Sequence, residues 1–455
     1  MSQLIISVSG LRGIVGQTLT PEVAARYAAA YADFAPAGPI VVARDGRANG
    51  GWLLDVVAGT LAAAGRDVLD AGVAATPTVG VLVGAHQAAG AVQVSASHNP
   101  APYNGLKLFS PAGQVLDAAA GAEVLERYHQ GRATWAASEQ VGTRQTIDDA
   151  HAAHLARVLA AVDVEAIRQR RFRVVLDANH GSGGLLGRRL LEALGCEATI
   201  LGEQPTGHFI HEPEPTEENL RDVTRQITDL GAAVGFCQDP DADRLALIDE
   251  RGRYIGEEAT LALCVEHVLG QKVGPIVTNC STSRMSQDLA ERAGAAFYRS
   301  RVGEANVVAL MQAQKAILGG EGNGGVIDPR VVYVRDSFIG MALVLEALAA
   351  RNEPLSALAN RLPQYHIVKT KITVPAERVA AALDALEAHF SKPHGERPAA
   401  QCDRLDGLRL DWPSGWLLVR ASNTEPIVRA IAEASTAEEA QGWCEEAAQV
   451  IKAMP

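Results

Sequence analysis

The chain has 455 residues, enough for about three domains of roughly 150 residues each or four small ones. Hydrophobic residues make up 47% of it and charged residues 21%, so large buried cores are possible. The net charge of -12 and the lack of a basic run argue against a nucleic-acid partner and against adhesion to anionic membranes. An anionic substrate would therefore need positive charge gathered locally.

The cellular compartment is predicted from features that the sequence lacks. No stretch reaches the roughly 20 apolar residues of a membrane helix, and the first residues do not resemble a signal peptide. Six cysteines lie too far apart for a CxxC metal or redox pair and are typical of reduced thiols. We expect a cytoplasmic protein, monomeric or homodimeric, with neither a nucleic-acid nor a membrane partner.

One local pattern occurs three times along the chain. An apolar β-branched run leads into a glycine-containing loop and then into an amphipathic helix. The runs and their helices are 39–47 with 50–64, 172–184 with 185–195, and 275–283 with 284–294. This alternation predicts three similar α/β domains with parallel or mixed sheets.

The last segment has a different pattern. Residues 366–375 alternate like a strand, 376–390 are helical, two further strand-like runs follow, and 436–454 form a terminal helix. Short connections predict a small antiparallel α+β domain. The expected domains, arranged around a central cleft, are 1–150, 151–254, 255–365 and 366–455.

An acidic motif is the strongest local signal for chemistry. Asp239, Asp241 and Asp243 alternate with Pro and Ala and are followed directly by Arg244. Three carboxylates this close repel one another unless a cation lies among them, and hard oxygen ligands suit Mg²⁺. An adjacent arginine suits a phosphoryl group. The alternative is an Asp-rich turn.

A serine motif is the second signal. Ser97 and His98 lie in the segment 95–100, and Lys107 follows in the run 103–107. A hydroxyl, a possible base and a cation are the parts of an activated nucleophile, although Ser-His-Asn-Pro is also an ordinary turn. Lys107 is the only lysine before Lys272 in a chain that otherwise uses arginine, and unlike arginine it can lose its proton.

Three further motifs are weaker. The loop 319–325 contains five glycines that allow close backbone approach, with Glu321 and Asn323 as partners for hydroxyl groups. The segment 420–426 offers an arginine and short polar side chains to a phosphate, or else begins a capped helix. The polar residues concerned are Arg420, Ser422, Asn423 and Thr424. Arg12 lies between glycines in the segment 9–13.

Two other motifs are interpreted as structural. His151 and His154 have the spacing of metal ligands on a helix but lack an acidic or cysteine partner in the sequence. The run 179–184 resembles a phosphate loop but lacks the lysine and the spacing of one, which favours a tight strand-to-helix turn.

Taken in order, these motifs resemble the α-D-phosphohexomutase superfamily, with one signature in each expected domain. The segment 95–107 is similar to the phosphoserine loop, 239–244 to the metal loop, 319–325 to the sugar-recognition loop and 420–426 to the phosphate-binding loop. The segment 9–13 is similar to the N-terminal arginine segment.

The resemblance implies roles for individual residues. Ser97 would carry a phosphoryl group, and Asp239, Asp241 and Asp243 would hold Mg²⁺ together with that phosphate. Arg244 would stabilise the phosphoserine, and Lys107 would transfer protons with Arg12 and His98 nearby. Sugar hydroxyls would bind Glu321 and Asn323. The phosphate that is not transferred would bind Arg420, Ser422, Asn423 and Thr424.

The implied reaction interconverts 6-phospho and 1-phospho sugars through a sugar bisphosphate, with a sugar 1,6-bisphosphate as activator. Phosphoglucosamine mutase is the first choice, and phosphomannomutase/phosphoglucomutase is the alternative. The rivals are a serine-phosphate phosphatase, which would hydrolyse the phosphoryl group rather than return it, and a non-catalytic sugar-phosphate sensor or scaffold. Two departures make the sugar harder to predict: Asn323-Gly324-Gly325 stands where many members have Ser-Gly-His, and Glu304 stands where many have Asp or His.

Overall fold

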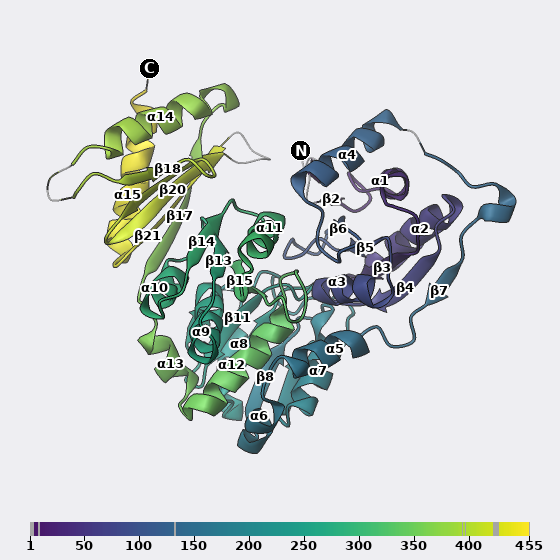
Figure 1. The fold of residues 1–455 in the computed structure, drawn as a ribbon, viewed down its shortest axis with the longest axis horizontal. Helices are drawn as coiled ribbons and strands as arrows, with labels where there is room; N and C mark the ends of the chain where they lie inside the picture. Colours follow the sequence, from purple (N-terminus) through teal and green to yellow (C-terminus); the bar gives the residue numbers. More distant parts are fainter. Residues whose placement is uncertain are drawn as a thin grey trace.

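The computed structural model describes residues 4–7, 10–131, 133–393, 395, 397–421 and 427–454. Four sheets follow one another along the chain, and each belongs to its own domain (Figure 1). The first three sheets are packed with helices, and the fourth forms a separate lobe. Within the described residues, no helix combines the length and the apolarity needed to cross a membrane.

The first domain has a seven-stranded mixed sheet in the order β1-β2-β6-β5-β3-β4-β7. Its strands are β1 (Ile5–Ser7), β2 (Gly10–Ile14), β3 (Ile40–Arg44), β4 (Val68–Val73), β5 (Gly90–Val94), β6 (Tyr103–Phe109) and β7 (Arg144–Thr146). Its helices are α1 (Pro21–Phe34), α2 (Gly50–Ala63), α3 (Thr76–Ala85) and α4 (Ala118–Gln130), with a 3₁₀ turn at Ser138–Gln140. Strand β3 is parallel to β4 and β5, whereas β6 is antiparallel to β5 and β2.

The second domain has a five-stranded sheet in the order β12-β11-β10-β8-β9. Its strands are β8 (Arg173–Asp177), β9 (Glu197–Leu201), β10 (Val234–Gln238), β11 (Leu245–Asp249) and β12 (Tyr254–Gly256). Its helices are α5 (Ala152–Ala160), α6 (Val164–Arg170), α7 (Gly183–Ala193) and α8 (Arg221–Leu230). Because β12 pairs with β11, this sheet runs to Gly256, across the boundary expected after residue 254.

The third domain has a four-stranded sheet in the order β14-β13-β15-β16. Its strands are β13 (Ile276–Asn279), β14 (Phe297–Ser300), β15 (Leu318–Glu321) and β16 (Gly325–Ile327). Its helices are α9 (Glu257–Gln271), α10 (Met285–Arg292), α11 (Glu304–Gln314), α12 (Ser337–Arg351) and α13 (Leu355–Arg361). In this domain β13 is parallel to β14 and β15, and the short β15–β16 hairpin carries the glycine-rich loop.

The fourth domain has an antiparallel sheet in the order β17-β21-β20-β19-β18. Its strands are β17 (His366–Thr373), β18 (Gln401–Asp403), β19 (Leu408–Trp412), β20 (Gly415–Ala421) and β21 (Ile427–Ala434). Helices α14 (Val379–Phe390) and α15 (Ala437–Lys452) accompany them, with a 3₁₀ turn at Ala376–Arg378. Together with the mixed sheets of the other domains, this antiparallel sheet confirms the predicted fold class.

The sequence pattern missed two strands of this sheet, β18 and β21. Strand β21 is rich in alanine, which is not typical of strands. Ala430, Ala432 and Ala434 are fully buried on it, and α15 packs against it. Small side chains at these positions allow the helix to lie close to the sheet.

The first three domains share a hydrophobic core, whereas the fourth domain has a separate one. One continuous hydrophobic core includes residues of α3, α5, α7, α9 and α12 and therefore spans the first three domains. The fourth domain has its own core, and a small cluster of Cys280, Trp416 and Leu418 connects it to the third domain. The first three domains thus pack as one body, to which the fourth is joined by this cluster and by hydrogen bonds such as those of Arg284 and Arg409.

The two motifs that the sequence indicated as structural lie inside this body. His154 is fully buried and bonds Thr78 Oγ1 at 2.9 Å and Asp336 Oδ2 at 2.8 Å, so it connects three domains. Asp336 is an acidic partner that the sequence did not reveal, and it caps α12. The run 179–184 is the turn between β8 and α7, as predicted.

Candidate active site

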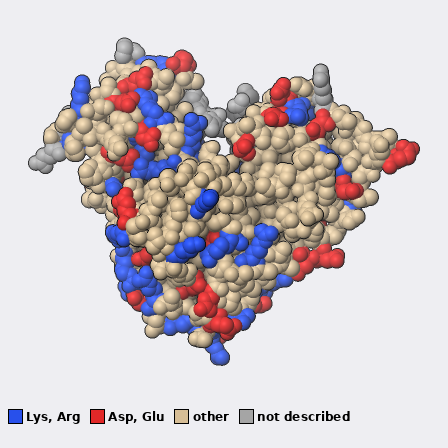
Figure 2. Space-filling view, in the orientation of Figure 1, with Lys and Arg blue, Asp and Glu red and all other residues tan. Residues whose placement is uncertain are grey.

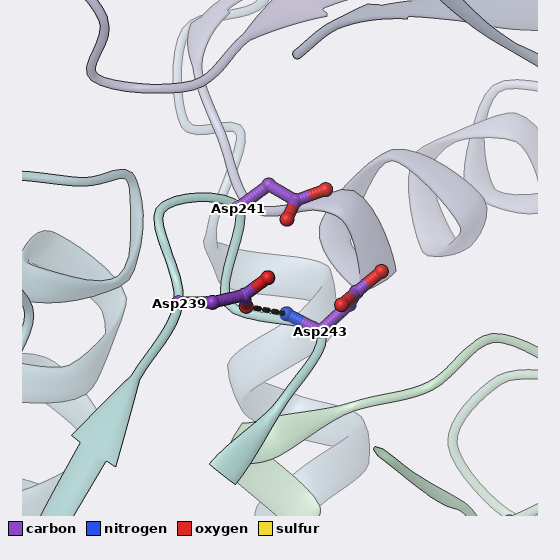
Figure 3. Close-up of side chains that lie close together, drawn as sticks. All are labelled: Asp239, Asp241 and Asp243. Atoms are coloured by element: carbon purple, nitrogen blue, oxygen red, sulfur yellow. Dashed lines mark hydrogen bonds between the residues drawn. The ribbon is translucent and has the colours of Figure 1, made fainter. Parts of the chain in front are cut away.

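Three buried carboxylates form the centre of the site, on the loop between β10 and β11 (Figure 3). Asp239, Asp241 and Asp243 are fully buried, and one oxygen of each lies within 4.8 Å of the others. Asp239 Oδ1 accepts hydrogen bonds at 3.1 Å from the backbone N–H groups of Asp243 and Arg244, which closes the loop. Within the described part of the chain, no other group of carboxylate, histidine or cysteine side chains is clustered in this way.

The state of these carboxylates fits a divalent cation. Asp241 Oδ1 and Asp243 Oδ1 are buried and have no hydrogen-bond partner, which is costly unless a cation binds them. Burial, together with the charges of Asp241 and Asp243, raises the pKa of Asp239 well above its usual value. Unpaired, hard oxygen donors of this kind are the ligands that Mg²⁺ prefers.

Ser97 reaches this centre from the first domain, on the loop after β5. Its side chain is 1% exposed, and its Oγ donates to Asp239 Oδ2 at 3.0 Å. Its backbone has a φ of 53°, in the left-handed region, and its N–H donates to Ser95 Oγ at 2.9 Å. A backbone conformation that is rare outside glycine therefore turns the hydroxyl toward the carboxylates.

Arg47 holds the serine loop (residues 95–100) in this shape. Its guanidinium donates to the backbone carbonyls of Ser97 at 2.6 Å and Asn99 at 2.5 Å, and also to those of Pro100 and Tyr103. Its Nε pairs with Asp45 Oδ2 at 3.1 Å. Sequence reasoning missed Arg47, and the only signal for it was a charged Asp-Gly-Arg directly after a buried strand.

Lys107 projects from β6 onto the same carboxylates. Its Nζ donates to Asp241 Oδ2 at 2.6 Å and to Asp243 Oδ2 at 2.9 Å. Burial lowers the pKa of Lys107, but the two aspartates raise it by more, so the net pKa lies above its ordinary value. In this arrangement Lys107 keeps its proton. The sequence had suggested a residue that can lose its proton, because lysine stands there in a chain that otherwise uses arginine.

His98, Arg12 and Arg244 lie at the same centre. His98 Nδ1 is 3.4 Å from Ser97 Oγ. Burial, with the positive charges of Arg244 and Arg12, lowers the pKa of His98 to about 3, so its ring is neutral at physiological pH. Arg244 Nε is buried and has no hydrogen-bond partner, which leaves a donor available for an anion.

The sugar loop (residues 319–325) begins at the end of β15. Glu321 is 5% exposed, and its Oε1 accepts from Asn279 Nδ2 at 2.7 Å and from the Gly303 N–H at 3.1 Å. Asn323 Nδ2 donates to Glu321 Oε2 at 3.4 Å. A Cβ on Gly322 would come within 2.0 Å of a Glu258 oxygen, so a larger residue there would displace that carboxylate.

A cavity of about 490 Å³ connects the domains, with a volume that suits a small polar ligand. His98, Arg244, Glu321 and Asn323 line one side of it, and four cations from the fourth domain line the other. These cations, here called the basic wall, are Lys369, Lys371, Arg420 and Arg429. Lysine and arginine side chains also gather on the inner part of the upper-left lobe in Figure 2, where a notch separates it from the upper-right lobe.

Of the four residues predicted to bind phosphate in the fourth domain, the structure describes Arg420, which lines the cavity and pairs with Asp406 at 3.2 Å. Ser422, Asn423 and Thr424 lie outside the described residues. The sequence analysis missed the other three cations of the basic wall, Lys369, Lys371 and Arg429. They lie on the neighbouring strands β17 and β21, where sheet pairing sets Arg429 opposite both Lys371 and Arg420.

Comparison with known proteins agrees with this geometry. Residues 4–134, 149–252 and 257–365 match the alpha/beta/alpha domains I, II and III of phosphoglucomutase/phosphomannomutase, and 370–450 match its C-terminal domain. The chain belongs to the phosphoglucomutase/phosphomannomutase family. The resemblance to the α-D-phosphohexomutase superfamily is thereby confirmed.

Individual relatives match over nearly the whole chain. A phosphoglucomutase/phosphomannomutase of Thermococcus kodakarensis is 36% identical over 446 residues, which are 96% of either chain. A probable phosphoglucosamine mutase of Methanopyrus kandleri is 32% identical over 448 residues, 98% of this chain and 97% of that relative. The structure of a family protein from Burkholderia thailandensis has a TM-score of 0.86 at 28% identity and covers 99% of this chain and 98% of its own.

Proposed function

We propose that this phosphohexomutase-family protein interconverts 6-phospho and 1-phospho sugars by way of a phosphoryl group on Ser97. The observation that carries the proposal is the hydrogen bond from the Ser97 hydroxyl to Asp239, within a buried carboxylate cluster. The chain neighbours His98 and Arg244 line a cavity that has a basic wall. In the forward step the bond between phosphorus and Ser97 Oγ breaks, and a new one forms to the free sugar hydroxyl. The resulting bisphosphate then returns its other phosphoryl group to Ser97.

Asp239, Asp241 and Asp243 would hold Mg²⁺ together with the phosphate on Ser97. The bound ion would neutralise charge that develops on the transferred group, which is most of what phosphoryl transfer requires. Arg244, with its unpartnered Nε, is placed to stabilise the same phosphate. Arg47 keeps the serine loop in the one shape that presents the hydroxyl to the carboxylates.

Proton transfer is assigned to Lys107 and His98, with Arg12 nearby. Lys107 keeps its proton in its pairing with Asp241 and Asp243, so it would donate when a serine oxygen leaves. The neutral ring of His98, whose Nδ1 lies 3.4 Å from Ser97 Oγ, would accept the proton of the attacking hydroxyl. This assignment needs no histidine in the sugar loop.

The two sides of the cavity would bind the two ends of the substrate. Glu321 and Asn323 would accept and donate hydrogen bonds to sugar hydroxyls, and Arg420 with Ser422, Asn423 and Thr424 would bind the phosphate that is not transferred. Lys369, Lys371 and Arg429 extend this basic surface. Two phosphate positions on opposite sides of one cavity would let either end of the sugar occupy either position, with a sugar 1,6-bisphosphate as activator.

For the sugar we propose glucosamine phosphate first, which agrees with the name of the Methanopyrus kandleri relative. The second candidate is a glucose or mannose phosphate, favoured by the higher identity of the relative named phosphoglucomutase/phosphomannomutase.

A coupled assay tests the proposal. Purified protein is given the 6-phosphates of glucosamine, glucose and mannose, with Mg²⁺ and the matching 1,6-bisphosphate, and the 1-phosphate and inorganic phosphate are both measured. We expect isomerisation that depends on the bisphosphate, with little release of inorganic phosphate. Release of inorganic phosphate as the main product would indicate a phosphatase. Tight binding without any turnover of the three sugars would indicate a sensor or scaffold.

A further inference from the structure

One side chain outside the predicted site residues joins the metal loop (residues 239–244) to the sugar loop. Arg335 lies between β16 and α12, and its guanidinium contacts three carboxylates. Its Nη2 donates to Asp243 Oδ2 at 2.6 Å, its Nη1 to Glu321 Oε2 at 2.8 Å and its Nε to Glu304 Oε2 at 3.1 Å. Its backbone N–H also donates to Glu304 Oε1 at 3.1 Å.

These contacts are buried. The Arg335 side chain is 11% exposed, and those of Asp243, Glu304 and Glu321 are between 0% and 9% exposed. A guanidinium in such a place is stable only when its donors are paired, and its planar fork orients each partner that it binds. Among the residues that the structure describes, Arg335 is the one cation hydrogen-bonded to both Asp243 and Glu321.

The path of the Arg335 side chain depends on Gly325. A Cβ at residue 325 would lie 2.3 Å from Arg335 Cδ and 2.7 Å from Cγ, so a larger residue would displace the stem of the arginine. Gly325 is one of two positions, with Asn323, at which the sequence departs from the Ser-Gly-His of many superfamily members. The absence of a side chain there creates the passage through which Arg335 reaches the site.

We infer that Arg335 is a positioning residue that couples cation binding at the metal loop to sugar binding at Glu321; this inference rests on the proposed function. Together with Lys107, the guanidinium occupies Asp243 Oδ2, while Oδ1 has no hydrogen-bond partner and is left for a cation. By occupying Glu321 Oε2, it fixes the orientation of the carboxylate that is proposed to meet the sugar. Loss of Arg335 should therefore weaken both binding events at once.

Binding measurements test the inference without turnover. Isothermal titration calorimetry of Mg²⁺, and separately of glucose 1-phosphate, is carried out on intact protein carrying Ser97→Ala, with and without Arg335→Met. We expect Arg335→Met to weaken Mg²⁺ binding by roughly 10- to 100-fold, the usual effect of removing a residue that orients a metal ligand. Glucose 1-phosphate should also bind more weakly, and Arg335→Lys, which keeps the charge but not the fork, should recover only part of either affinity.

Arg330 provides the matched control. It lies five residues earlier and pairs with Asp328 at 2.6 Å, also donating to the Ala161 carbonyl at 2.8 Å, away from the cavity. Arg330→Met should leave both affinities unchanged. If Arg335→Met does not fold, Gly325→Ala displaces the same guanidinium while keeping every charge, and it should weaken both affinities in the same direction. Unchanged affinities in the folded Arg335 variant, or in Gly325→Ala, would overturn the inference.

The outcomes separate this inference from the proposed function. Suppose that the Ser97→Ala protein binds Mg²⁺ and glucose 1-phosphate in a way that depends on Arg335, but that the wild type isomerises none of the sugars. The proposed function then fails and the positioning role stands. If the wild type isomerises a sugar while Arg335→Met changes neither affinity, the positioning role fails and the function stands.

Discussion

The two sides of the cavity are built in opposite ways. On the transfer side, next to the cavity residues His98 and Arg244, the buried Ser97, Asp239 and Lys107 are at most 5% exposed. They come from two domains that share one continuous core. On the basic wall, Lys369, Lys371 and Arg429 are exposed and belong to a domain with its own core. The fourth domain is joined to the third through a small hydrophobic cluster that includes Trp416.

Under the proposed function, this difference separates the residues that transfer the phosphoryl group from the residues that bind the far end of the substrate. A group that must lie within hydrogen-bond distance of Ser97 gains from a rigid, buried frame, because a small displacement of reacting groups costs much of the rate. A surface that binds the far end of a substrate gains instead from accessible cations that can reach the ligand. We expect changes on the transfer side to reduce kcat and changes on the basic wall to raise KM.

The largest effect is expected for Ser97→Ala. Without the hydroxyl there is no phosphoryl acceptor, so turnover should fall by roughly 10⁴-fold or more, as when other enzymes lose a nucleophile. Calorimetry should show that sugar-phosphate binding is retained, because the basic wall is untouched. Turnover close to that of the wild type would remove Ser97 from the mechanism.

Asp241→Asn should have the next largest effect. It removes a charge from the cluster and one partner of Lys107, and a metal ion commonly contributes several kcal/mol to charge stabilisation, so kcat should fall by about 10²- to 10³-fold. A Mg²⁺ titration should show weaker binding. Asp328→Asn, at a fully buried aspartate outside the cavity, is the control and should keep its Mg²⁺ dependence.

Arg420→Met tests the other side. Hydrogen bonds to charged groups contribute about 1.5–3 kcal/mol, so KM should rise roughly 10- to 100-fold while kcat changes much less. Steady-state kinetics at saturating Mg²⁺ measure both constants. A fall in kcat without a change in KM would contradict the division between the two sides.

His98→Gln should produce a smaller change. The ring has a pKa of about 3, so it is already neutral across the range from about pH 5 to pH 8 and cannot produce an inflection there. We expect a lower kcat and a pH profile of unchanged shape. Loss of an inflection in that range would show instead that His98 titrates with an ordinary pKa.

The smallest effect concerns stability. Burial and the neighbouring carboxylates raise the pKa of Asp239 above its value in the unfolded chain, so the folded state binds more protons between these two values. Without Mg²⁺, this group should make the protein less stable as the pH rises through that window. The difference in Tm between wild type and Asp239→Asn, followed against pH, should show the trend, and saturating Mg²⁺ should remove it. A difference independent of pH would contradict the raised pKa.

Much of this architecture could be predicted from the sequence alone. The repeated strand–loop–helix pattern predicted the three α/β domains, because an apolar run followed by glycine and an amphipathic stretch is typical of a strand that leads into a helix. Asp239, Asp241 and Asp243 were predicted as a cluster, since they lie within five residues and one loop brings them together. The C-terminal sheet was predicted less completely, because alanine is not typical of strands. The alanines of β21 are explained only by the packing of α15 against that strand.

The sequence by itself predicted which loops would carry chemistry, because each loop is a short run of residues whose composition indicates a kind of site. Only the tertiary structure decided how they meet. Arg47 and Arg335 act on residues 50 and 92 positions away, and no local pattern distinguishes them from other arginines in the chain. Their role follows from burial: an arginine deep between domains must pair with whatever the fold places around it, and here the fold places the serine loop around one and the carboxylates of the site around the other.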